Sequence, residues 1–266
     1  MRKIIIMTIV IGILASTLTS CSLKFGVESR KESNSSEGSM EQSSKLIPID
    51  GIENIDIDID AANIVINEVD GNEVNVEFIG KRNLENKTKV EKEGNTIVIK
   101  QNYSNSGFKF GISSFEGQKV IIGIPSIYIE NLSLEYGAGN VTVKGIKVND
   151  LYIIGGAGNL DIRNIVFTSL DLEQGVGNTD IELKEKSGNI KIEGGAGNLS
   201  LKMEEVAGNL TCAGGVGQTK IYIPDQSPVQ IKTSSGLGKS DINANTSGEN
   251  TYKFNLDVGI GSISVN

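Results

Sequence analysis

The chain has 266 residues, of which 38% are hydrophobic and 22% are charged, so it is long enough to bury a substantial core. Its formal net charge of −8 argues against a nucleic-acid partner, because phosphate binding requires clustered Lys and Arg. Histidine is absent, which excludes Ser-His-Asp catalysis, Cys-His catalysis and His-rich zinc sites.

The first 20 residues have the pattern of a secretory signal peptide. Arg2 and Lys3 form a short positive segment, and residues 4–18 are apolar or small over a length too short for a comfortable membrane span. Leu18-Thr19-Ser20-Cys21 then resembles the bacterial lipobox, in which the cysteine is diacylated before the signal peptide is cleaved in front of it. An ordinary secretory signal with an incidental cysteine is the alternative.

These residues predict a lipoprotein signal peptide over 1–20 and lipidation of Cys21. The mature chain is then expected to be anchored by lipid on the extracytoplasmic face of the cell membrane. Residues 21–44 comprise the lipidated cysteine and a segment too polar to fold, which predicts a flexible linker.

Residues 45–131 are rich in predicted strands but lack a regular repeat. We expect them to form irregular first coils of the same solenoid as the repeats that follow. Asp56, Asp58 and Asp60 alternate with isoleucine, which favours a solvated outer face over a row of cation ligands. Residues 101–118 form an irregular insertion with three phenylalanines, and such a loop is a candidate contact surface for a ligand.

From residue 132 to the C-terminus the sequence repeats with a period near 20. Each repeat carries a Gly-x-Gly anchor, at residues 137–140, 156–159, 175–178, 195–198, 215–218, 236–239 and 259–262. Two alternating columns follow the anchors and are predicted to face inward. The first column is Val141, Leu160, Thr179, Leu199, Thr219, Ser240 and Ile263, and the second is Val143, Ile162, Ile181, Leu201, Ile221, Ile242 and Val265.

A second short strand precedes each anchor, so each repeat supplies two strands joined at glycine corners. Equivalent strands of successive repeats would pair in parallel. The sequence therefore predicts an all-β fold, a parallel β-solenoid with rungs of about 20 residues over 132–266.

The fourth position of the first four anchors is always asparagine. Asn140, Asn159, Asn178 and Asn198 are expected to stack as a structural ladder, because stacked amides can hydrogen-bond along the solenoid. Gly188-Asn189 and Gly208-Asn209 suggest that the opposite corner is sometimes built in the same way. Cys212 falls in a column otherwise filled by Leu, Ile and Val, which predicts a buried core thiol.

Calcium is an alternative ligand for the glycine corners. Residues 155–161 resemble the Gly-Gly-x-Gly-x-Asp repeat of calcium-loaded β-rolls, but Asp161 comes one residue too late and would point to the other face. No metal ligands, cofactor or catalytic residues are predicted.

Lys119–Pro125, then Leu132-Ser133-Leu134 and the repeated Gly-x-Gly-Asn strands, together resemble the bacterial "putative adhesin" family, a β-solenoid domain of unknown function in cell-envelope proteins. The resemblance covers about residues 48–266. It implies a binding or structural module for an unknown envelope or surface ligand, in adhesion or in envelope-stress signalling. It supplies no catalytic residues to carry over.

A polysaccharide-acting parallel β-helix enzyme is the alternative function, since such enzymes can use Lys, Arg and Asp with calcium. The outward columns suggest no cluster of these residues on adjacent rungs, which predicts that the chain is not an enzyme.

Residues 259–266 form a full repeat strand at the C-terminus, and an uncovered last rung would offer an open edge for self-association. The alternative is that residues 243–250 fold over this end and cap it.

Overall fold

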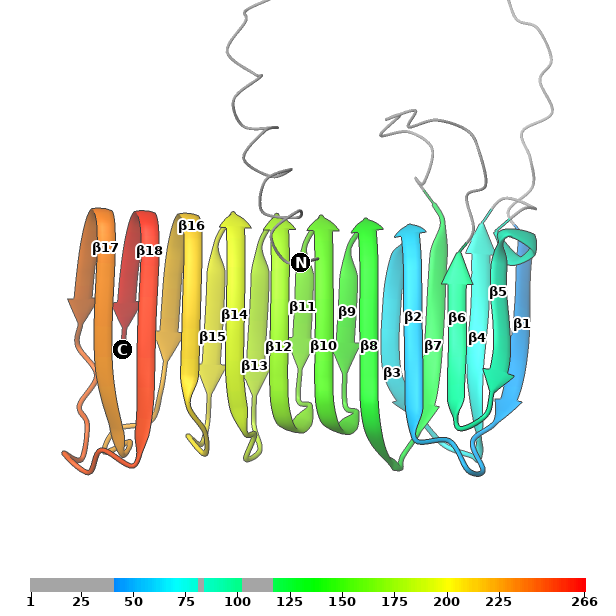
Figure 1. Ribbon diagram of the computed structural model, residues 1–266, viewed down its shortest axis with the longest axis horizontal. Coiled ribbons are helices and arrows are strands. Elements are labelled where there is room, and N and C mark those ends of the chain that lie inside the picture. The colour runs from blue at the N-terminus through cyan, green and yellow to red at the C-terminus, as the bar shows by residue number, and fades with distance from the viewer. Residues whose placement is uncertain (1–40, 81–83, 102–116) are drawn as a thin grey trace, which may run out of the picture. The chain divides into compact units, whose positions relative to one another are not determined.

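The computed structural model describes residues 41–80, 84–101 and 117–266, and apart from one 3-10 turn, η1 (Glu85–Lys87), its regular structure is β-strand (Figure 1). Eighteen strands form one solenoid-like sheet, which confirms the prediction of an all-β chain. Cys21 and most of the predicted insertion at 101–118 lie outside the described residues. None of the described ranges contains a helix of the length and apolar character that a membrane span requires.

In chain order the strands are β1 (Glu41–Pro48), β2 (Asn54–Ala61), β3 (Asn63–Val69), β4 (Glu73–Gly80), β5 (Thr88–Glu93), β6 (Thr96–Gln101), β7 (Lys119–Pro125), β8 (Tyr128–Ala138), β9 (Val141–Lys144), β10 (Lys147–Ala157), β11 (Leu160–Arg163), β12 (Val166–Val176), β13 (Thr179–Leu183), β14 (Asn189–Ala196), β15 (Leu199–Met203), β16 (Leu210–Tyr222), β17 (Val229–Ile242) and β18 (Tyr252–Val265).

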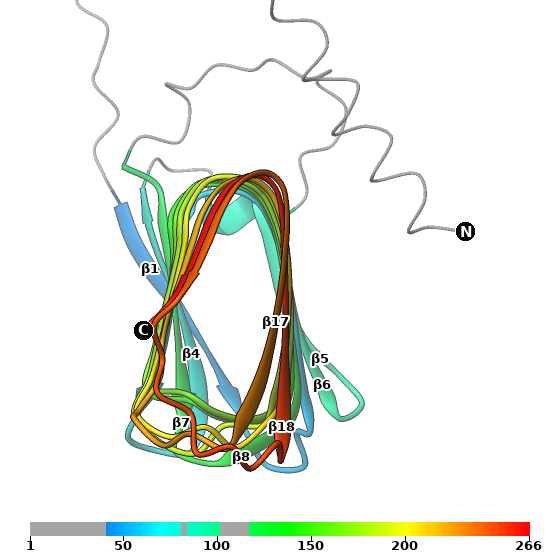
Figure 2. The same cartoon turned by 90° about the vertical axis from the view of Figure 1, so that its left-hand side faces the viewer.

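Two walls of parallel strands enclose the core. One wall contains β8, β10, β12 and β14, and the other contains β9, β11, β13 and β15; partners in neighbouring strands are 19 or 20 residues apart. Viewed along the stack, successive turns superpose as a flattened loop (Figure 2). This register places equivalent side chains of successive repeats one above another, as the alternating columns require.

The interior is aliphatic over most of its length. Of the second predicted column, Val143, Ile162, Ile181, Leu201, Ile221 and Val265 are buried. Ile242 is the exception, with 46% of its surface exposed. Its strand is β17, which pairs only with β18 among the named strands.

The last strand of the chain does not form the end of the sheet. β18 pairs in parallel with β16 on one side and with β17 on the other, so β17 is the outermost strand (Figure 1). Ile263 in β18 is only 1% exposed. The prediction that residues 259–266 form an open C-terminal rung is therefore wrong. Self-association through that rung stays a prediction, without the open edge from which it was argued.

The side chains of the two strands explain this order. Leu256 and Val258 of β18 are each 2% exposed, whereas their partners in β17 are Thr233 and Ser235. Polar inward residues cost less in a terminal strand, where water reaches them, than between two packed turns. The loop over 243–250 brings the chain back from β17 to β18, and Thr246 forms a bridge to Ser227 of the neighbouring loop. The loop over 243–250 thus lies beside the loop that contains Ser227.

The N-terminal part is only partly built as coils. β2 and β3 stack in parallel on β8 and β9 as one regular turn. In contrast, β4 is antiparallel to both β1 and β7, and β5 and β6 form an antiparallel hairpin. The hairpin turns at Gly94, whose φ of 64° suits glycine. The expectation that residues 45–131 form only coils of the solenoid is wrong for β1, β4 and β5, which pair in antiparallel fashion. In addition, β1 begins four residues before the predicted boundary at residue 45.

Candidate binding surface

Asparagine side chains connect successive turns at the glycine corner. The Oδ1 atom of Asn140 accepts hydrogen bonds from the backbone N (3.2 Å) and Nδ2 (3.2 Å) of Asn159. The same pair of bonds joins Asn159 to Asn178 and Asn178 to Asn198. Asn63 begins the ladder below Asn140, and the backbone N of Gln218 ends it. The side chains thereby satisfy backbone donors that the corner leaves without a sheet partner.

The opposite corner has a shorter ladder. The Oδ1 atom of Asn189 accepts from the backbone N and Nδ2 of Asn209, and the Oδ1 of Asn209 accepts from the backbone N of Lys253. These bonds join three turns, and the third belongs to β18. The ladder thus ties the inserted final strand to its neighbour.

The glycines at the corner are required by close stacking of the backbone. Gly158 has a φ of 136°, and an ideal Cβ atom there would lie 1.9 Å from the carbonyl oxygen of Gly139. No side chain fits such a position. Within each Gly-x-Gly anchor, only the middle residue therefore carries a side chain. This side chain projects outward from the corner between the two walls, which forms one long edge of the flattened sheet.

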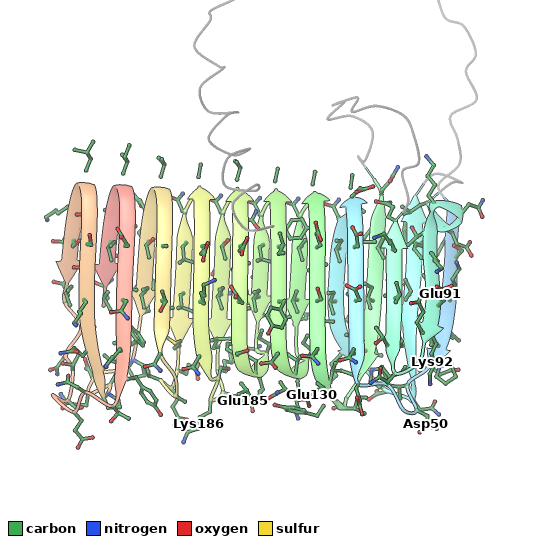
Figure 3. The ribbon with its side chains drawn as sticks, viewed as in Figure 1. Asp50, Glu91, Lys92, Glu130, Glu185 and Lys186 are labelled. Carbon is green, nitrogen blue, oxygen red and sulfur yellow. The ribbon has the colours of Figure 1, made fainter. Side chains whose placement is uncertain are left out.

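These middle residues, together with Ala61 of β2, form a continuous apolar ridge. In spatial order it consists of Ala61, Ala138, Ala157, Val176, Ala196, Val216, Ile260 and Leu237, each paired with the next in the sheet register. At a strand spacing of about 4.8 Å, eight strands make the ridge roughly 34 Å long. Its larger members are well exposed: Val176 by 51%, Val216 by 42%, Ile260 by 51% and Leu237 by 70%. A row of apolar sticks stands along this edge in Figure 3.

One wall carries an ion-pair cluster on its outer face. Arg163 contacts Asp161 (2.5 Å), Asp180 (3.3 Å) and Glu182 (2.7 Å), and Lys202 also reaches Glu182 (3.5 Å). The Arg163 guanidinium holds the pKa of the Glu182 carboxyl below its usual value. The prediction that no such residues cluster on adjacent rungs is thus wrong. The arrangement is a solvent-facing ion-pair network in which Arg163 and Lys202 pair with the three carboxylates.

The aspartates that were considered as cation ligands do not come together at one site in the structure. Asp161 faces outward and pairs with Arg163, as just described, and Asp58 pairs with Lys100 at 2.7 Å. Asp56 and Asp60 are exposed on the same strand. In the part of the chain that the structure describes, no group of three or more Cys, Asp or Glu side chains is arranged to hold a metal ion.

Among the described residues, two titratable groups, Tyr136 and Cys212, are buried in the interior. The hydroxyl of Tyr136 donates a hydrogen bond to Oε1 of Gln174, and burial raises the pKa of Tyr136 to about 12. Cys212 is 2% exposed, and burial raises the pKa of its thiol to about 11. A cavity of about 40 Å³ lies next to Cys212, beside Gly194 and Gly214. Its size admits water at most, so it is no substrate pocket.

Sequence reasoning treated the middle residue of each anchor as an unconstrained position and so missed the ridge. The signal was present, because all seven repeat anchors carry Ala, Val, Leu or Ile there. It missed the Arg163 cluster because the aligned columns stopped one position short of Arg163 and Glu182, which are paired in the register.

Comparison with solved structures finds proteins that align with most of this chain. A protein from Clostridium sporogenes, described as a putative cell adhesion protein, is 17% identical over 85% of this chain and 99% of its own, with a TM-score of 0.48. A putative adhesin from Bacteroides fragilis is 18% identical over 85% and 97%, with a TM-score of 0.49. A putative lipid binding protein from Parabacteroides distasonis is 16% identical over 85% and 96%, with a TM-score of 0.45.

No curated protein matches the chain. A family profile described as Toastrack DUF4097 matches residues 52–256, which is most of the chain and nearly all of the described sheet. The chain therefore belongs to the Toastrack DUF4097 family.

Proposed function

We propose that the chain is a lipid-anchored, extracytoplasmic binding or structural module of the bacterial cell envelope, serving in adhesion or envelope-stress sensing. The observation that carries the binding role is the apolar ridge, an exposed surface on a backbone that both ladders hold rigid. Exposed apolar surface on a rigid scaffold is typical of contact with a partner. We further propose that the repeat unit of this scaffold is a parallel solenoid rung of about 20 residues.

The lipid anchor is supported by the sequence Leu18-Thr19-Ser20-Cys21 behind an apolar signal segment. Two acyl chains on Cys21 would hold the mature protein at the membrane, since each buried methylene contributes about 0.8 kcal/mol to membrane affinity. The chain has one other cysteine, Cys212, which is buried in the core and cannot be the acylated residue of the folded protein.

The test is expression of the full precursor in a bacterium that processes lipoproteins, followed by detergent phase partition and mass spectrometry. We expect the wild-type protein and Cys212→Ala to enter the detergent phase with an acylated N-terminal cysteine. Cys21→Ala should leave the detergent phase or remain as an uncleaved precursor. An unmodified Cys21 in the wild-type protein contradicts the proposal.

A further inference from the structure

The exposed members of the ridge are not needed by the fold. Val176, Ile260 and Leu237 project from the edge with at least half of their surface in solvent, so a serine or threonine would be accommodated at the same positions. Adjacent turns nevertheless place apolar side chains next to one another along this edge from β2 to β17. A continuous exposed apolar strip of this kind indicates contact with an apolar medium or partner.

The two long edges of the sheet differ in charge. Within two residues on either side of Val176, Val216 and Ile260 the sequence has no charged residue, and Leu237 has only Lys239. The opposite edge carries charged side chains, among them Glu130, Glu185 and Lys186, which are labelled along it in Figure 3. Such a contrast suits a molecule that turns one edge toward an apolar boundary and the other toward water.

The chain enters the sheet at the ridge edge. In the register of this wall, Gln42 of β1 pairs with Ile79, Ile79 pairs with Lys119, and Lys119 pairs with Asn63, which directly follows the corner at Ala61. β1 therefore begins at the level of the ridge. It does so at the far end of the sheet from β17 (Figure 1).

We propose that the ridge rests on the surface of the lipid bilayer that holds the acylated Cys21, so that the sheet lies lengthwise along the membrane. This inference rests on the proposed lipid anchor. The 19 residues over 22–40 separate Cys21 from β1. An unstructured chain of this length would span on the order of 25 Å, so the anchor would keep the N-terminal end of the edge close to the lipid.

At the other end, Leu237 and Ile260 are the largest side chains of the ridge, and they insert at the boundary between headgroups and acyl chains. Lys239 lies beside them, with its side chain 77% exposed and its ammonium 3.0 Å from the Asp241 carboxylate. Because the anchor already confines the domain near the bilayer, a weak apolar contact is sufficient to orient it.

The experiment uses the mature, acylated protein in phosphatidylcholine vesicles that carry a nitroxide on the lipid headgroup. An environment-sensitive fluorophore is attached to Leu237→Cys or, as the matched control on the charged edge, to Glu185→Cys. Acylation blocks Cys21 and burial protects Cys212, so the label enters at the introduced cysteine. We expect nitroxide quenching and a blue shift at position 237 and neither effect at position 185.

Two further variants test the ridge itself. Val216→Ser with Ile260→Ser should abolish quenching of the label at position 237, while flotation with the vesicles persists and the urea midpoint is unchanged. Flotation with equal quenching at positions 237 and 185, or with none, overturns the membrane contact and leaves the anchor intact. Cross-linking of Leu237→Cys between copies without quenching overturns it in favour of a second copy of the chain. Failure of the wild-type protein to float overturns the anchor itself.

Discussion

Tyr136 and Gln174 belong to strands two turns apart, and the tyrosine hydroxyl lies 2.5 Å from Oε1 of Gln174. Gly155 of the intervening turn lies between them, and an ideal Cβ atom on it would be 2.2 Å from the glutamine oxygen and 2.5 Å from the tyrosine oxygen. The missing side chain of Gly155 is therefore what allows this buried contact.

Alanine at two interior glycines should have opposite effects. Gly155→Ala should destabilise the protein by about 1 to 3 kcal/mol, because the added methyl group displaces the Tyr136 ring and breaks the bond to Gln174. Gly194 borders the cavity, and the nearest atom to an ideal Cβ there is the Cα of Gly214 at 3.9 Å. Gly194→Ala should stabilise by about 0.4 to 1 kcal/mol. Urea unfolding measures both, and a gain in stability for Gly155→Ala would contradict the packing described.

The interior column and the outer face should respond very differently to charge. Ile181→Asp would bury an unpaired carboxylate at a position with 0% exposure and should cost more than about 3 kcal/mol, enough to unfold a marginal domain. Its neighbour Asp180 is an exposed partner of Arg163, so Asp180→Ser should change the unfolding free energy by about 0.5 kcal/mol or less. Equal losses in a chemical denaturation series would mean that the strand faces are reversed.

The asparagine ladder should stabilise the protein through its internal members. Asn159→Ala removes the acceptor for the backbone N and Nδ2 of Asn178 and the donor to Asn140, and should cost about 1 kcal/mol. Gln218 contributes only its backbone N to the ladder, so Gln218→Ala should be nearly neutral. Differential scanning calorimetry of both variants, together with the double variant, gives the comparison. Similar melting shifts for the two would assign the ladder no energetic role.

Alkaline pH should destabilise the fold through the two buried acids, Tyr136 and Cys212. The pKa of Tyr136 is raised to about 12 and that of Cys212 to about 11 in the folded protein, above their unfolded values of 10.0 and 9.0. The neutral forms are thus favoured by folding, and this stability is fully present below pH 9 and is lost as pH rises through 11 and 12. Unfolding free energies between pH 8 and 11.5 should fall, and the fall should be smaller for Tyr136→Phe. A pH profile that the substitution leaves unchanged would rule out this cause.

The interior columns could be predicted from the sequence because neighbouring turns are related by a nearly constant offset, and Ile162, Ile181 and Leu201 repeat at it. The order of β17 and β18 could not be predicted from the sequence. Gly238 and Gly261 pair with each other at the same corner, so either strand fits the same register. Only the inward residues distinguish them, Thr233 in one and Leu256 in the other. The antiparallel strands at the N-terminal end depend on contacts between distant segments such as Gln42 and Ile79, which local periodicity does not encode.

The insertion of β18 between β16 and β17 has a consequence for the order of folding. β17 precedes β18 in the chain, yet its sheet partner in the finished fold is β18. Earlier turns can stack in chain order, because each pairs with a preceding one. The last two strands cannot reach their final places until β18 is available and separates β17 from the stack. A chain truncated after residue 242 would therefore hold β17 without its final sheet partner, and limited proteolysis of the truncated chain should cut within β17 while sparing β8 to β14.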